Sequence, residues 1–205
     1  MRHTVQAEGF GVRLRPVRME DAEFIVWLRN LDYVKGRVGD SAVDVISQQK
    51  WLETYFDREG DYYFIVETPG RIPAGTYGIY NVKGNSGESG RWIIRPGVPA
   101  AVPSAVVVLD IAFNELSLRE VHGSTVATNQ TVLSINRKFG FRRTGVQPAA
   151  QVIGGKAVDL VNFSMTAGEW PKARERLMPL VRLAEAQVLE WERENYQTTV
   201  CSGTE

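Results

Sequence analysis

A strand-like run, a loop of small residues and a helix-like run follow one another in RWIIRPGVPAAVPSAVVVLDIAF, residues 91–113. N–H groups at the start of a helix have no partner within the helix, and with the helix dipole they attract anions. Pro99 removes one possible donor, whereas Pro103 suits a first helical position. The loop also contains small residues that let a phosphate approach the backbone: Gly97, Ala100, Ala101 and Ser104. Either the stretch binds a phosphate, or it is a stiff connection.

Other phosphate motifs and covalent catalysis find little support. The loop contains neither the Gly-Lys-Ser/Thr of a P-loop nor the G-x-G-x-x-G of a dinucleotide site. The single cysteine, Cys201, lies in a polar tail with no evident base beside it, so it is a poor candidate nucleophile. The residue pattern calls for no metal.

The elements that position this loop form an α+β pattern. We expect helices from 18–21 to 29–30, then at 47–59 with Ser47 as the cap, 103–118, 130–139 closed by Gly140, and 169–196. We expect strands at 11–17, 62–67, 75–82, 89–94 and 121–128, and a hairpin of 141–153 and 157–165. The short turns between the middle strands favour an antiparallel meander. Residues 31–45 are expected to be an irregular loop.

The last long helix carries one apolar stripe, formed by Leu177, Leu180, Val181, Ala184, Val188 and Trp191. The stripe favours packing against the domain, and a dimer contact is the alternative. We therefore expect a single domain at 10–166, a helical extension at 167–196 and a tail at 197–205. The oligomeric state is expected to be monomer or homodimer.

The composition excludes several classes of protein. The 205 residues are 43% hydrophobic and 23% charged, which is ordinary for one globular domain. The formal net charge is zero, so no global basic field favours nucleic acid or a membrane surface. No apolar run approaches the roughly 20 residues of a membrane span, and the start lacks the apolar core of a signal peptide. We expect a cytoplasmic protein.

At this point the sequence resembles the GCN5-related N-acetyltransferases (GNAT family), over about residues 10–166. Three segments carry the resemblance: the strand-loop-helix of 91–113, the strand VHGSTVAT followed by Asn129, and SINRKFGF at 134–141. The resemblance is strongest to the branch that acetylates ribosomal proteins and small molecules. It implies a central, mostly antiparallel twisted sheet flanked by helices, here with an extra C-terminal helix.

The resemblance also implies acetyl-CoA as co-substrate. Its pyrophosphate would bind the loop at Gly97 and the N–H groups near Ala100, Ala101, Val102 and Ser104, although Pro99 stands where the family usually has glycine. The remaining implied cofactor contacts are the backbone of Ile93, Ile94 and Arg95 for the pantetheine arm, and Asn129, Ser134 and Lys138 farther on.

The implied reaction is direct acetyl transfer to an amine, which must lose its proton to a carboxylate or histidine, directly or through water. Glu88, at the start of a strand, is one candidate base and a solvated turn residue is its alternative role. His122 is the second candidate, with a structural role favoured. Asn136 replaces the tyrosine that protonates the leaving thiolate in many relatives, so water, Tyr77 or Tyr80 would serve as the acid.

The acceptor is expected to be a small-molecule amine bound by the first helices and middle strands. The candidate substrate residues are Arg29, Asn30, Tyr77, Asn81 and Trp92. Arg29, Lys35 and Arg37 could hold a diphosphate. The run WLRN…ISQQKWLETYF…DYYFIVE is similar to acetyltransferases of nucleotide-linked amino sugars, although Trp27 and Trp51 are expected in the core. A protein N-terminal amine is the alternative acceptor, and a catalytically silent CoA-binding or interaction module is the alternative function.

Overall fold

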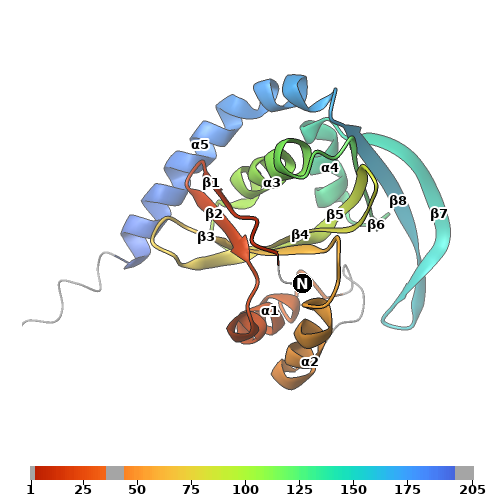
Figure 1. Ribbon diagram of the computed structural model, residues 1–205, viewed down its shortest axis with the longest axis horizontal. Helices are drawn as coiled ribbons and strands as arrows, with labels where there is room; N and C mark the ends of the chain where they lie inside the picture. Colours follow the sequence, from red (N-terminus) through yellow and green to blue (C-terminus); the bar gives the residue numbers. More distant parts are fainter. Residues whose placement is uncertain (1–2, 36–43, 197–205) are drawn as a thin grey trace, which may run out of the picture.

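The computed structural model describes residues 3–35 and 44–196, which form one eight-stranded sheet between two layers of helices (Figure 1). The strand order is β1-β2-β3-β4-β5-β6-β8-β7. All neighbouring strands are antiparallel except β5 and β6, which are parallel. The strands are β1 (Ala7–Gly9), β2 (Val12–Pro16), β3 (Tyr62–Glu67), β4 (Pro73–Lys83), β5 (Ser86–Ile94), β6 (Glu120–Val126), β7 (Arg142–Ile153) and β8 (Lys156–Thr166).

The helices divide between the two faces of the sheet. The α-helices are α1 (Ala22–Arg29), α2 (Val45–Tyr55), α3 (Ala101–Asp110), α4 (Gln130–Phe139) and α5 (Trp170–Tyr196). A 3-10 turn, η1 (Met19–Asp21), precedes α1, and a π-helical turn, η2 (Ile111–Glu115), follows α3. Figure 1 shows α1 and α2 on one face, and α3, α4 and α5 on the other, while the β7–β8 hairpin curves away at one edge. This arrangement confirms the predicted fold class.

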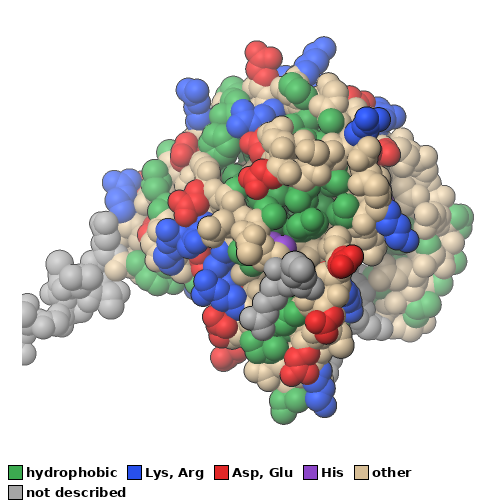
Figure 2. All heavy atoms as spheres, viewed as in Figure 1, with side chains coloured by type: hydrophobic (Ala, Val, Ile, Leu, Met, Phe, Trp, Pro, Cys, Tyr) green, Lys and Arg blue, Asp and Glu red, His purple; other side chains and the backbone are tan. Residues whose placement is uncertain are grey.

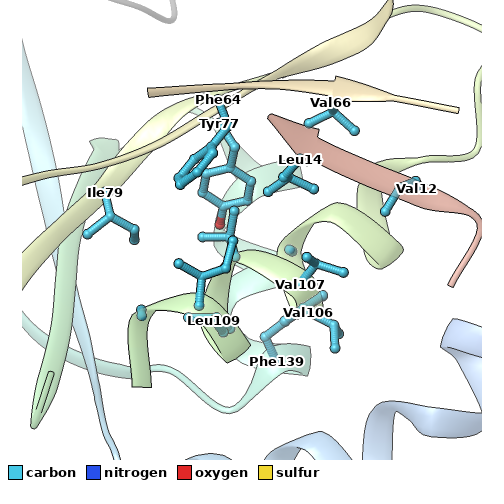
Figure 3. Close-up of a cluster of buried hydrophobic side chains, with 14 of the residues drawn as sticks. Val12, Leu14, Phe64, Val66, Tyr77, Ile79, Val106, Val107, Leu109 and Phe139 are labelled. Carbon is cyan, nitrogen blue, oxygen red and sulfur yellow. The ribbon is translucent and has the colours of Figure 1, made fainter. Parts of the chain in front are cut away.

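The larger core lies between the sheet and α3. Every residue of α3 from Pro103 to Leu109 is buried, because this helix lies between the strands and α5. Figure 3 shows Leu14, Phe64 and Tyr77 pointing from the strands toward Val106. The apolar stripe of α5 packs on this layer as predicted, except that Leu180 is 42% exposed.

The opposite face carries a smaller core under α1 and α2, beside a buried ionic network. Arg15 of β2 donates to both carboxylate oxygens of Asp21, at 2.8 and 2.7 Å, and to Glu67 of β3 at 2.6 Å. Paired buried charges of this kind fix the position of the groups that make them. The network ties η1, and therefore the start of α1, to the sheet.

Several predicted boundaries need correction. Asp44, not Ser47, caps α2: its Oδ1 accepts from the Ser47 N–H at 2.8 Å, so the helix begins at Val45. The helix expected at 103–118 begins at Ala101 and passes into η2 after Asp110. Part of the loop expected at 31–45 falls on 36–43, outside the described residues.

The described chain begins at His3, which packs on the sheet. The His3 ring packs 5.2 Å from the Tyr62 ring and 5.0 Å from the Phe64 ring, and its Nε2 lies 3.2 Å from the Tyr63 carbonyl oxygen. Burial lowers the pKa of His3 from its ordinary value of 6.5. Residues 7–9 add the edge strand β1, which sequence patterning missed because three residues carry little periodicity.

Within the part of the chain that the structure describes, no helix is both long and apolar enough to cross a bilayer. Acidic and basic side chains are interspersed over the face shown in Figure 2, as the balanced composition suggests.

Candidate active site

The two parallel strands pair only briefly and then separate. β5 pairs with β6 over Ser86–Glu88 and Glu120–His122, and no pairing between them continues beyond these residues. At the point of separation Gly123 approaches β5 so closely that a Cβ there would lie 2.7 Å from the Ser89 carbonyl oxygen. The rest of β5 therefore presents unpaired backbone groups to the space beside it.

A bulge in β5 assists this separation. Thr76 of β4 pairs with Ile93 and Gly78 pairs with Gly90, so β4 advances two residues while β5 advances three. Arg91 takes up the extra length with a left-handed backbone, φ 53°. Bulges of this kind bend a strand and re-aim its side chains.

A cavity of about 200 Å³ lies between the separated end of β5 and α4. The Tyr33 hydroxyl crosses to this strand and donates to the Ile94 carbonyl oxygen. Burial raises the pKa of that phenol. The lining residues come from four parts of the chain: Tyr33, Val34, Trp92, Ile93, Ile94, Ala101, Asn129, Thr131, Val132 and Ile135.

The loop after β5 leads into α3 with an open turn. Gly97 has φ 82°, and a Cβ there would meet nothing within 4 Å. The N–H of Val98 bonds to Arg95 at 3.3 Å and that of Ser104 to Ala100 at 3.0 Å. The predicted donor at Ser104 is therefore already used, because it lies one turn into the helix. The first-turn N–H groups of Ala101 and Val102 are the ones placed to meet an anion.

The Ser104 side chain is also internal. Its hydroxyl donates to the Ala101 carbonyl oxygen at 3.0 Å and accepts from the Trp92 indole at 3.3 Å. The residue is fully buried. Its structural role is to join the first turn of α3 to β5, beneath the loop.

Asn129 is the residue of α4 that best fits a cofactor contact. It is the N-cap, its Oδ1 accepts from the Val132 N–H at 3.3 Å, and it lines the cavity. Ser134, also predicted to meet the cofactor, instead lines a groove between α4 and the β7–β8 hairpin. Lys138 is exposed and lines neither space. Both positions follow from the helical period, which turns residues 134 and 138 away from β5.

The Arg95 side chain lies at the entrance to the loop between two indoles. Its guanidinium carbon is 5.7 Å from the centroid of Trp27 and 5.9 Å from that of Trp191. Trp27 is 43% exposed, so the expectation that it belongs to the core is wrong. It lies near the end of α1, where it stacks on Phe24 at 5.9 Å between ring centroids.

A second hollow, of about 510 Å³, contains Glu88 and His122. These two residues are direct partners in the parallel β5–β6 register, so their side chains share one face of the sheet. Hydroxyl, amide and carboxylate side chains dominate the lining: Glu88, Glu120, His122, Gly123, Ser124, Thr144, Gln147, Asn162, Phe163 and Ser164. We call this hollow the polar cleft.

Two neighbours on β4 donate to the Glu88 carboxylate. The Tyr80 hydroxyl donates to Oε1 at 3.0 Å, and the Asn81 amide donates to Oε2 at 2.9 Å. Burial, followed by the nearby carboxylate, raises the pKa of the Tyr80 phenol. Tyr80 therefore holds its proton and uses it in this hydrogen bond.

An arginine packs directly behind Tyr80. The Arg91 guanidinium lies 4.3 Å from the Tyr80 ring centroid and forms a two-pronged ion pair with Asp61, one contact being 2.9 Å. Arg29 is also largely removed from water, and burial lowers the pKa of its guanidinium. Sequence reasoning missed Arg91 and Asp61, because a pair 30 residues apart has no local signal.

Three predicted substrate residues have other positions. Tyr77 is 4% exposed, stacks on Trp92 and accepts from the Ser89 hydroxyl at 3.3 Å in the larger core; burial raises the pKa of Tyr77 to about 12. Trp92 itself lines the cavity between β5 and α4. Asn30 is exposed, and its amide donates to the Val26 carbonyl oxygen as part of the α1 terminus. Side chains alternate between the two faces of a strand, so Tyr77 faces the side opposite to Tyr80. Tyr80 is the register partner of Glu88, so Tyr77 and Glu88 lie on opposite faces of the sheet.

Asn136 lies where many relatives have an acidic tyrosine. It lines the groove between α4 and the β7–β8 hairpin, and its Nδ2 is buried without a hydrogen-bond partner among the described residues. An amide has no proton to give to a thiolate at ordinary pH, so this side chain cannot replace the phenol.

Two parallel strands that diverge beside the N-terminus of α3, with a cavity between β5 and α4, form an acetyltransferase-type fold. The sequence model described as "Acetyltransferase (GNAT) domain" matches residues 12–142, and the chain belongs to this family. The resemblance predicted from the three sequence segments is confirmed. No curated protein sequence matches the chain.

Solved structures agree with this assignment. A GCN5-related N-acetyltransferase from Brucella melitensis is 19% identical, with 87% of this chain and 86% of that chain covered and a TM-score of 0.75. Mycobacterium smegmatis RimJ in complex with CoA-disulfide is 23% identical. The match covers 87% of this chain and 96% of that chain, with a TM-score of 0.75. Apo FdhC, described as a nucleotide-linked sugar GNAT, is 26% identical. The match covers 88% of this chain and 98% of that chain, with a TM-score of 0.70.

Proposed function

We propose that this protein is an acetyl-CoA-dependent N-acetyltransferase in which Glu88 accepts the proton of the acceptor amine. The observation that carries the proposal is the position of Glu88. Its carboxylate lies where β5 and β6 begin to separate and opens into the polar cleft. A carboxylate at this point can reach an amine that approaches from the cleft, directly or through one water.

The residues around the cavity fit acetyl-CoA. The β5 edge at Ile93 and Ile94 suits the amides of the pantetheine arm, and binding there would displace the Tyr33 hydroxyl from Ile94. The first turn of α3 at Ala101 and Val102 suits the pyrophosphate. Bound acetyl-CoA supplies an activated acyl group.

The chain's own residues then handle one proton. As the amine nitrogen bonds to the acyl carbon and the carbon–sulfur bond breaks, Glu88 takes the proton from nitrogen. His122, the register partner of Glu88, is the neighbour that could share a bridging water. Asn136 has no acidic proton, so we assign protonation of the leaving thiolate to solvent.

For the acceptor we favour a nucleotide-linked amino sugar. Five of the residues that line the polar cleft carry hydroxyl or amide side chains that can hydrogen-bond to a sugar ring: Ser124, Thr144, Gln147, Asn162 and Ser164. The likeness to a nucleotide-linked sugar GNAT over 88% of the chain supports this choice. Arg29 and Lys35 stay predictions for the diphosphate, while Arg37 lies outside the described residues.

The test is an acceptor screen. Purified protein with acetyl-CoA is offered nucleotide-linked amino sugars, a polyamine and a peptide with a free N-terminus, and thiol release is measured. We expect turnover with an amino-sugar nucleotide, and about a 100-fold or greater loss of kcat in Glu88→Gln. The matched control is Glu190→Gln, an exposed glutamate of α5. Turnover of the peptide alone would replace the acceptor, and full activity of Glu88→Gln would remove Glu88 as base.

A further inference from the structure

Two side chains of β4 converge on the Glu88 carboxylate of β5. Tyr80 and Glu88 face each other in the antiparallel register, and the Tyr80 hydroxyl bonds to Oε1 at 3.0 Å. Asn81, the next residue, bonds to Oε2 at 2.9 Å. Each carboxylate oxygen thus has its own donor, from adjacent residues of one strand.

Local structure that is otherwise unfavourable makes these two contacts possible. Adjacent residues of a regular strand point to opposite faces, so Tyr80 and Asn81 could not both reach Glu88. Asn81 has a left-handed backbone, φ 52°, and the β4–β5 register shifts between Tyr80 and Lys83. The irregularity turns the Asn81 amide back to the face that Tyr80 occupies. Asparagine tolerates such a backbone better than most residues, although it remains less favourable than a regular strand.

The Tyr80 phenol is itself confined from two sides. The Arg91 guanidinium packs on its ring at 4.3 Å, held by the ion pair with Asp61. At the other side stands Gly90, where a Cβ would lie only 2.5 Å from the Tyr80 hydroxyl oxygen. A side chain at position 90 would therefore push the hydroxyl off Glu88.

We propose that Tyr80 and Asn81 are positioning residues that hold the Glu88 carboxylate in one orientation toward the polar cleft. The proposal rests on the proposed function, because it concerns the same proton transfer. It assigns Tyr80 a role other than the general acid, for which the sequence left Tyr80 as one of three alternatives beside Tyr77 and water. One donor at each oxygen restricts the rotation of the carboxylate, and productive proton transfer needs a fixed geometry.

The test is a set of double-mutant cycles with Glu88→Gln. We expect Tyr80→Phe and Asn81→Gly each to lower kcat roughly 10-fold, with the KM for acetyl-CoA unchanged. In the Glu88→Gln background neither change should lower kcat further, because both act through the carboxylate. Glycine at 81 accepts the left-handed backbone, so Asn81→Gly removes the amide alone. Tyr196→Phe is the matched control: it deletes a hydroxyl from an exposed tyrosine of α5, and kcat should stay unchanged.

The possible outcomes separate the proposal from the function on which it rests. If Tyr80→Phe lowers kcat by the same factor in both backgrounds, Tyr80 acts independently of Glu88, as an acid would, and the proposal is overturned. If Glu88→Gln keeps full activity, the base assignment fails instead. Crystal structures of Tyr80→Phe and Asn81→Gly give a readout without turnover: Glu88 should occupy several rotamers, and one unchanged rotamer would contradict the positioning role.

Discussion

Replacing Asn129 with alanine should have two separable effects, because we assign this side chain two roles. Its Oδ1 caps α4 by accepting from the Val132 N–H at 3.3 Å. The same residue is only 8% exposed and lines the cavity between β5 and α4. Loss of an N-cap costs about 1 kcal/mol, which lowers Tm by about 2–4 °C in a chain of this size. Loss of one hydrogen bond to the cofactor should weaken binding by about 3- to 10-fold.

A second substitution separates the two effects. Asn129→Asp keeps a capping oxygen, so Tm should stay close to that of the wild type. The new negative charge would lie beside the proposed site of an anionic cofactor, so acetyl-CoA affinity should still fall. Calorimetric titration gives the affinities and thermal unfolding gives Tm. Asn129→Ala could lower Tm as expected but bind acetyl-CoA as tightly as the wild type. In that case Asn129 is only a helix cap, and the placement of the cofactor arm beside α4 is refuted.

Three further predictions follow from buried groups. Arg15→Leu leaves two buried carboxylates without their partner, so urea unfolding should show a loss of about 3–5 kcal/mol, and an unchanged midpoint would contradict the network. His3 is buried with a lowered pKa, so the folded state binds its proton less readily than the unfolded state does. His3 therefore makes stability fall as the pH drops below about 6.5, and His3→Leu should flatten that part of the profile measured by thermal unfolding. Gly90→Ala should displace the Tyr80 hydroxyl and lower kcat roughly as Tyr80→Phe does, and full activity there would contradict the close contact.

The fold was largely predictable because its long elements have strong periodic signals. The continuous apolar run of the strand Tyr62–Glu67, the helix closed by Gly140 and the stripe of α5 are all local patterns. Boundaries failed where a residue outside the predicted element decides them. Asp44 caps α2 from outside the predicted helix, and the three residues of β1 gain order only by pairing with β2.

The candidate site was predictable in part. Glu88 and Asn129 were named from the family resemblance, and the structure places Glu88 within β5 and Asn129 at the N-cap of α4. The ion pair of Arg91 with Asp61 and the contact of Tyr33 with Ile94 join residues 30 and 61 positions apart, and sequence spacing carries no trace of them. Side-chain direction also decided several cases, since Tyr77 and Tyr80 belong to one strand but face the core and Glu88 respectively.

The most direct test of the central claim is acetyl-CoA binding by calorimetry to the purified chain. We predict saturable binding at one site per chain, which Ala101→Glu, a negative charge at the first turn of α3, should abolish. No binding at millimolar acetyl-CoA would contradict the account, and would favour a protein that has kept the fold as an interaction module.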